Sequence, residues 1–558
     1  MQKLRWQLII IFLTGLVVGF LLLGEQPSAQ IFAPEPATGG VYAEALTGEI
    51  RRLNPVLDFY NPVDRDIDRL IYSGLIRFDD RGMPLADLAE SWGISKDGTI
   101  YNFALRPGIK WHDGEPLTTR DVLFTVELIR EGGEAVPEDL QNFWQQIEVI
   151  VLNDTSMQFR LPESFAPFLD YLSFGILPEH LLGSMTFEEM VNAPFNLQPV
   201  GSGPFRFERL IVEDNRITGV VLTAFDEYYG KKPYIEQVVF RLYPTSALSF
   251  QAYQDGVVKG IGNVTEDILP GVLAEPSLSL YTSRRPEMSI VFLNLKNPAT
   301  PFFQDVAVRK ALLQGLNRQR MIDQLLNGQA FVADGVVLPG SWAYYDGIER
   351  VVYDPEAART QLKNAGYVVA GENPIRQKEG VALRFELIYP DDDFHAAQAE
   401  AMQKDWALLD IQVDLLPLPF DALINQRLAE RNYQAALVDI NLSRLPDPDP
   451  YPFWDQTQAV GGQNYSQWDN RTASEYLEQA RITVDINERA RMYRNFQVLF
   501  NEDLPSLPLY YPLYNYAVSE QIQGVRVGPL YDSSDRFSTL TDWYLITKLP
   551  SKLPANVP

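Results

Sequence analysis

Residues 88–127 read LAESWGISKDGTIYNFALRPGIKWHDGEPLTTRDVLFTVE, and this stretch predicts a mixed α and β unit. Its Lys-Asp-Gly run predicts a hairpin turn between two extended segments. In residues 101–105, aromatic and apolar side chains alternate with polar or small ones, which is typical of a half-buried strand. Thr118 and Asp121 have the spacing of a capping box, so a helix should begin there.

The rest of the chain continues the alternation of strands and helices. Residues 287–295, EMSIVFLNL, are almost all apolar, which favours a strand in the middle of a sheet. Residues 305–327 predict one helix, with Gly328 at its C-terminal cap. Asp354 followed by proline predicts a second helix start. The pattern therefore predicts an α/β protein, without the repeats of a solenoid.

Composition excludes several classes of protein and site. The chain has 558 residues, 46% hydrophobic content, a net charge of -26 and a pI near 4.6. This length allows about three or four domain-sized units. The acidity argues against a nucleic-acid partner. There is no cysteine and there are only three histidines, so disulfides and thiolate metal sites are excluded, and no cofactor or metal site is expected.

Motifs for catalysis are also missing from the sequence. Gly201-Ser202-Gly203 lacks the spacing of a nucleophile elbow, and no P-loop or metalloprotease motif occurs. Carboxylates are so numerous that a glycosidase pair could be chosen anywhere in the chain, so their presence carries almost no signal for that chemistry. His112 lies beside a turn, where a structural hydrogen bond is favoured over metal ligation. We therefore expect a protein that is not an enzyme.

The N-terminus predicts export. Lys3 and Arg5 precede an uncharged apolar run, Leu8–Gly24, which reads as a signal or membrane anchor in residues 1–24. Residues 25–39 are small and Pro-rich, as in a tether. The remainder is expected outside the cytoplasmic membrane, in the periplasm or on the outer face, either tethered or secreted.

Several stretches, in order, resemble one family. They are LNP (53–55), YSGLI (72–76), the 88–127 block, ILPEH (176–180), PVGSGPFRF (199–207), KKPYIEQVVFRLYP (231–244), DVAVRKALLQGLNR (305–318), YDPEAARTQLKNAGY (353–367), PDPDPYPFW (446–454), QNYSQWDN (463–470) and NEDLPSLPLYYP (501–512). The family is the extracytoplasmic solute-binding proteins of ABC importers, family 5, which includes oligopeptide and dipeptide receptors. The resemblance covers roughly residues 41 to 547.

The resemblance implies a two-lobed clamshell of the periplasmic-binding-protein type II, with mixed sheets flanked by helices and an extra domain. Domain I would comprise residues 40–71, 199–286 and 512–547, domain II 72–198, and domain III 287–511, before a loose tail at 548–558. A peptide or other small polar solute would bind between the lobes. A monomer would deliver it to a membrane permease with ATPase subunits.

A proline-rich loop, LSRLPDPDPYPFW at 442–454, bears on the type of solute. Peptide receptors of the family commonly carry an aspartate three residues before the first Asp of this turn, where it pairs with the α-ammonium group. Here that Asp is Asp447, and Arg444 stands three residues earlier. A positive side chain therefore stands at the position where peptide receptors of the family carry a negative one. Arg444 either contacts the solute or forms an ion pair that braces Asp447 and Asp449.

Other positions of the family also carry over to this chain. The predicted ligand contacts are Tyr60, Asn61, Asn263, Val264, Met288, Ser289, Asn441, Leu442, Ser443, Arg444 and Trp454. For Trp454, packing beneath the turn is the alternative to stacking on the solute.

The sequence leaves several functions open. An importer receptor for a peptide is the main hypothesis, and an oligosaccharide receptor is the alternative, since the chain has 9 Trp and 27 Tyr. Nickel or a metal chelate is disfavoured because histidines are few. An envelope glycoside hydrolase and a sensory receptor are hypotheses from other classes.

Overall fold

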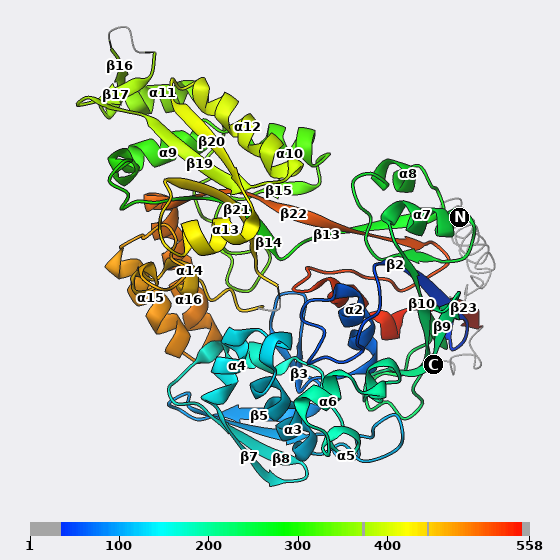
Figure 1. The fold of residues 1–558 in the computed structure, drawn as a ribbon. Helices are drawn as coiled ribbons and strands as arrows, with labels where there is room; N and C mark the ends of the chain where they lie inside the picture. Colours follow the sequence, from blue (N-terminus) through cyan, green and yellow to red (C-terminus); the bar gives the residue numbers. More distant parts are fainter. Residues whose placement is uncertain (1–34, 371–373, 444–445, 549–558) are drawn as a thin grey trace, which may run out of the picture.

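The computed structural model of the protein describes residues 35–370, 374–443 and 446–548. These residues form a two-lobed molecule in which helices flank mixed sheets (Figure 1). One lobe contains the elements from β14 to α16, coloured green, yellow and orange. The other contains the elements from β2 to β13, coloured blue, cyan and green, together with the red C-terminal segment. The predicted α/β clamshell class is confirmed. The domain boundaries stay a prediction.

The strand β22 (Ser506–Ser519) belongs to both lobes. Its first half pairs with β14 (Glu287–Leu293), where Ser289 lies opposite Tyr510. Its second half pairs with β13 (Leu278–Arg284), where Arg284 lies opposite Leu513. The chain thus crosses between the lobes on β22 and again between β13 and β14, and these strands lie side by side (Figure 1).

The crossing strands belong to a 12-stranded sheet with the main order β20-β19-β21-β14-β22-β12-β2-β11-β10-β9. Its other strands are β2 (Val41–Thr47), β9 (Phe205–Glu213), β10 (Arg216–Ala224), β11 (Gln237–Tyr243), β12 (Gly260–Ile261), β15 (Ala330–Val332), β19 (Arg384–Pro390), β20 (Gln412–Leu418) and β21 (Ala435–Asn441). As predicted, β14 is central, because β21 and β22 pair with its two edges.

Each lobe has its own large hydrophobic core. One core contains apolar residues between Met288 and Tyr511, and the other contains residues from Tyr42 to Phe240 together with Tyr514 and later residues. The division falls within β22, between Tyr511 and Tyr514. Two separate cores joined by a few strands are what hinge motion requires.

The 88–127 block folds as predicted. It forms β5 (Ala89–Ile94), β6 (Ile100–Leu105) and α3 (Thr119–Arg130). Thr118 and Asp121 make both bonds of the capping box. The strands join β8 (Ser156–Arg160) and β7 (Glu148–Asn153) in a four-stranded sheet, and α4 (Glu138–Gln145) packs on α3.

The single helix predicted over 305–327 is wrong. The structure has α9 (Val306–Gln314) and α10 (Arg318–Leu325), separated by Gly315 and its neighbours. Asn317 caps α10 by accepting a hydrogen bond from the Arg320 amide, so the side chain competes with a continuous helix.

The other helices of this lobe are α11 (Pro355–Asn364), α12 (Asp393–Ala407), α13 (Phe420–Ala422), α14 (Tyr451–Trp454), α15 (Arg471–Ile482) and α16 (Ile486–Asp503). In the other lobe, α2 (Pro62–Ile71), α7 (Ser246–Gln254) and α8 (Leu269–Leu273) flank the sheet. The predicted start of α11 is confirmed, with Asp354 as N-cap. Among the residues that the structure describes, no helix is long and apolar enough to cross a membrane. The predicted anchor lies in the segment before residue 35, outside the described residues.

A buried ion cluster joins the two ends of the chain in one lobe. The Arg536 guanidinium is fully buried and donates to Glu44 on β2, at 2.8 Å, and to Asp66 on α2, at 2.7 Å. The hydroxyls of Tyr42 and Tyr516 each donate to Glu44 at 2.6 Å. The cluster therefore holds the C-terminal segment against the N-terminal strand and β22.

We expect Arg536→Met to destabilise the protein by about 3–5 kcal/mol, because it leaves two carboxylates buried without their cation. Arg241→Met is the matched control. It removes an ion pair with Glu213 whose side chains are 29% and 58% exposed, so its cost should stay under about 1 kcal/mol. Urea unfolding curves measure both, and equal losses for the two variants would contradict this account.

Candidate functional site

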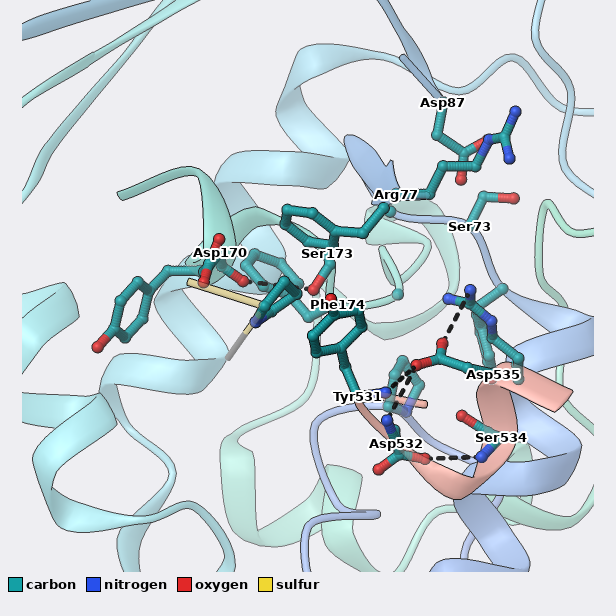
Figure 2. A pocket seen from close by; sticks show the side chains of 18 of the residues that line it. Ser73, Arg77, Asp87, Asp170, Ser173, Phe174, Tyr531, Asp532, Ser534 and Asp535 are labelled. Atoms are coloured by element: carbon teal, nitrogen blue, oxygen red, sulfur yellow. Dashed lines mark hydrogen bonds and ion pairs between the residues drawn. The ribbon is translucent and has the colours of Figure 1, made fainter. Parts of the chain in front are cut away.

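A cavity of about 890 Å³ lies where the two lobes meet. Most of its lining comes from the segments 55–87, 137–175 and 529–541. The lobe built on β14 contributes Ser443, Pro446 and Arg481. Figure 2 shows part of this wall, with Asp170, Ser173 and Phe174 on one side and the 531–535 segment on another. Its volume is in the range of pockets that bind small molecules.

Aromatic side chains form one wall of the cavity. Phe143 on α4 stacks on Tyr171, with ring centroids 4.1 Å apart. Phe165 lies 5.6 Å from Phe143, and the Arg481 guanidinium covers the Phe165 ring at 5.3 Å. These rings offer flat apolar surface beside polar groups.

Half-buried carboxyl groups form another wall. Burial raises the pKa of Asp87, which accepts a 2.5 Å hydrogen bond from the Tyr229 hydroxyl. Burial also raises the pKa of Asp535, which accepts from the amides of Tyr531 and Asp532 (Figure 2).

Asp68 on α2 differs from these groups. Its side chain lines the cavity, the residue is 3% exposed, and neither carboxyl oxygen has a hydrogen-bond partner in the part of the chain that the structure describes. Burial, with Asp58 and Asp64 nearby, raises its pKa well above the ordinary range. The folded state therefore favours the protonated form of the Asp68 carboxyl group more than the unfolded chain does.

The proline-rich loop is braced by two arginines that sequence reasoning missed. Arg489 on α16 pairs with buried Asp447, which also accepts from the Tyr493 hydroxyl at 3.1 Å. Arg481 on α15 pairs with Asp449 at 2.7 Å. Both arginines lie more than 30 residues along the chain from their partners, so no local sequence signal reveals the pairs.

The same loop contacts the opposite lobe. The Asp447 amide donates to the carboxyl group of Asp170 at 2.6 Å. A second contact between the lobes lies at the end of α15, where Ser164 donates to the Ile482 carbonyl at 2.9 Å. Burial, and then the charge of Asp447, raise the pKa of Asp170 well above its usual range. The loop is thus a direct bridge between the lobes at the edge of the cavity.

The structure places the predicted ligand contacts in different surroundings. Ser443 lines the cavity, Asn441 is exposed at the end of β21, and Leu442 packs on the core. Arg444 lies outside the described residues.

The other predicted contacts lie away from this cavity. Val264, Met288 and Trp454 are at most 3% exposed and belong to hydrophobic cores. Trp454 packs on Phe292 and Phe500, as its structural alternative predicted.

The remaining predicted contacts are polar residues near helix and strand ends. Ser289 is buried and accepts from Gln398, and Asn61 caps α2. Tyr60 is 68% exposed. Asn263 keeps a buried carbonyl oxygen without a hydrogen-bond partner among the described residues.

His112 has the structural role that was favoured. Its Nδ1 accepts from the Gly201 amide at 3.1 Å, and its Nε2 lies 3.0 Å from the Gly203 carbonyl. Burial lowers its pKa to about 4, so the imidazole is neutral and joins the 199–203 loop to the turn at 111–114.

Two lobes with separate cores, a shared strand and a cavity between them define a clamshell binding protein. Comparison with known proteins gives the family. The sequence model described as "Bacterial extracellular solute-binding proteins, family 5 Middle" matches residues 84–463. The chain belongs to this family.

Relatives and solved structures agree. The chain is 26% identical to the dipeptide-binding protein of Escherichia coli (strain K12), over 79% of this chain and 84% of the relative. It is 28% identical to the nickel-binding periplasmic protein of the same strain, over 65% and 68% of the two chains. The solved oligopeptide-binding protein AppA of Bacillus subtilis, in complex with a nonapeptide, is similar with a TM-score of 0.66 and 25% identity, covering 92% of this chain and 100% of AppA.

The raised pKa of Asp68 predicts a pH-dependent effect of Asp68→Asn. A carboxyl group whose pKa is higher in the folded than in the unfolded state contributes stability below the unfolded value, and this stability is lost as the pH rises through the folded value. Asparagine cannot ionise, so the variant should match the wild type near pH 4 and exceed it by about 1–3 kcal/mol at pH 8. Denaturant unfolding at several pH values measures this difference.

Asp226→Asn is the control, because Asp226 is exposed. A gain at pH 8 that is no larger for Asp68→Asn than for Asp226→Asn would contradict a raised pKa of Asp68 in the folded state.

Proposed function

We propose that the protein is the extracytoplasmic receptor of an ABC importer, which captures a peptide or a peptide-sized polar solute in the cavity between its lobes. The observation that carries this proposal is that side chains from both lobes line one cavity, in a molecule whose lobes share the strand β22. Closure of the lobes would bury the solute, and the closed form would be presented to a membrane permease with ATPase subunits.

Relatives named as dipeptide- and oligopeptide-binding proteins support a peptide as the solute. The cavity walls also suit a peptide, because they combine aromatic surface with polar groups that can bind a backbone. We propose that the residues 441–444 contact the solute, since Ser443 lines the cavity and Arg444 follows it directly.

A metal is a weaker candidate, although one relative is named as nickel-binding. In the described parts of the chain, no group of three or more histidine, cysteine, aspartate or glutamate residues could hold a metal ion. An oligosaccharide is the second candidate, and the stacked rings of Phe143 and Tyr171 favour it, because sugars pack on aromatic faces. We further propose that residues 1–39 tether the receptor near its permease, which raises its local concentration there.

Native mass spectrometry of the full chain, purified in mild detergent without refolding, tests the solute class. We expect a series of co-purified masses that differ by amino-acid residues. A single sugar mass would favour the oligosaccharide receptor instead. Hydrolysis of a bound sugar during the measurement would contradict a pure binding function and support an envelope hydrolase.

A further inference from the structure

Arg284 is a buried cation without a counter-ion at the crossing between the lobes. It is the last residue of β13, and it is 8% exposed. Its Nε and Nη2 atoms are buried and donate no hydrogen bond. Among the residues that the structure describes, no carboxylate pairs with it. Burial lowers the pKa of Arg284, and the neighbouring side chains of Tyr531 and Tyr511 oppose this effect.

The other buried arginines show how unusual this is. Six arginines are buried in the described parts of the chain. The five besides Arg284 donate hydrogen bonds to carboxylates or backbone carbonyls; they are Arg309, Arg318, Arg376, Arg489 and Arg536. Among the described residues, the guanidinium of Arg284 is thus the exception, although burying a charge without a counter-ion is costly.

Tyr531 connects Arg284 to the solute cavity. Its side chain lines the cavity (Figure 2). Its buried hydroxyl interacts with the Arg284 guanidinium, but neither group makes a hydrogen bond of normal geometry among the described residues. The hydroxyl of Tyr511 cannot serve as a donor to a ligand, because it already donates to the carbonyls of Gly335, at 2.6 Å, and Val337.

Two glycines with positive φ keep space around this pair. A Cβ at Gly340 would lie 3.0 Å from Nη1 of Arg284, and a Cβ at Gly82 would lie 2.8 Å from the Tyr531 hydroxyl. Both turns would be strained and crowded by a larger residue. The backbone at Gly340 therefore lies close to the Arg284 guanidinium, and the backbone at Gly82 lies close to the Tyr531 hydroxyl.

We propose that Arg284 and Tyr531 form an oxyanion subsite behind the Tyr531 wall of the cavity, which binds a carboxylate group of the captured solute. The edge of the guanidinium that carries Nε and Nη2 matches the two oxygens of a carboxylate, and the tyrosine hydroxyl supplies a third donor. The subsite names the chemical class of the solute, and in this respect it rests on the proposed function of the cavity.

The subsite also bears on how the solute is oriented. Arg284 is opposite Leu513 on β22, and the next residue, Arg285, donates its amide to the Pro512 carbonyl. A carboxylate bound here would therefore contact the strands on which the lobes turn. An anionic end at the hinge would leave the rest of the solute to contact the aromatic wall and the 441–444 segment.

Binding of paired ligands by the full-length protein tests the proposal. The probes are a mixture of alanine-, phenylalanine- and lysine-containing tripeptides, supplied either as free acids or as C-terminal amides. The wild type should prefer the free acids by about tenfold or more in Kd, and Arg284→Gln should lose this preference. Tyr531→Phe should lower the preference without abolishing it.

Arg285→Gln is the matched control, because Arg285 is the neighbouring arginine, is 37% exposed and lies 3.9 Å from Glu287. It should keep the wild-type preference. Arg284→Lys, which keeps the charge but lacks the planar fork, should lose the preference and replaces Arg284→Gln if that variant does not fold. A preference that survives in the folded Arg284 variant overturns the proposal.

A second readout separates this proposal from the peptide hypothesis. Sodium acetate and sodium phosphate, compared at equal ionic strength with sodium chloride, should raise the melting temperature of the wild type and of Arg285→Gln but not of Arg284→Gln. If no tripeptide binds and this anion effect is present, the peptide hypothesis fails and the oxyanion subsite stands.

A larger shift of the melting temperature with phosphate than with acetate indicates a phosphorylated solute. An anion effect that is absent from the wild type, or equal in Arg284→Gln, overturns the subsite.

Discussion

One fourteen-residue strand, β22, is hydrogen-bonded into both lobes, and the rest of the architecture depends on it. Its two halves belong to different hydrophobic cores, so the lobes can rotate about the strands without exposing either core. β13 and β14 pair with β22 and also run between the lobes, so within the described sheet only these neighbouring strands connect the lobes. Such a joint allows hinge closure and resists separation of the lobes.

Charge is distributed around this joint in two ways. Buried arginines that serve the fold are paired, as Arg536 is with Glu44 and Arg489 with Asp447. Groups beside the cavity are left without partners in the described structure, as Asp68 and Arg284 are. An unpaired buried polar group in a native structure needs an explanation, and the proposed oxyanion subsite offers one for Arg284.

Local sequence patterns correctly predicted those helices and strands that are determined by a few neighbouring residues. The capping box at Thr118 and the apolar run of β14 needed only a few neighbouring residues to be recognised. The helix over 305–327 failed because Asn317 forms a cap that the apolar spacing alone did not reveal. Ser443 was predicted and lines the cavity, whereas Arg481, Tyr531 and the phenylalanines of its wall were missed. Their positions depend on contacts between distant segments, which one sequence does not display.

Movement of the lobes about β22 is the central claim, and a distance between spin labels tests it most directly. The chain has no cysteine, so Glu131→Cys and Lys363→Cys place one label on each lobe at exposed sites. Lys363→Cys with Lys404→Cys is the control pair within one lobe. The account predicts that the distance between the lobes shortens when the co-purified solute is restored to protein freed of it, while the control distance stays constant. An inter-lobe distance unchanged by saturating solute would contradict closure about β22.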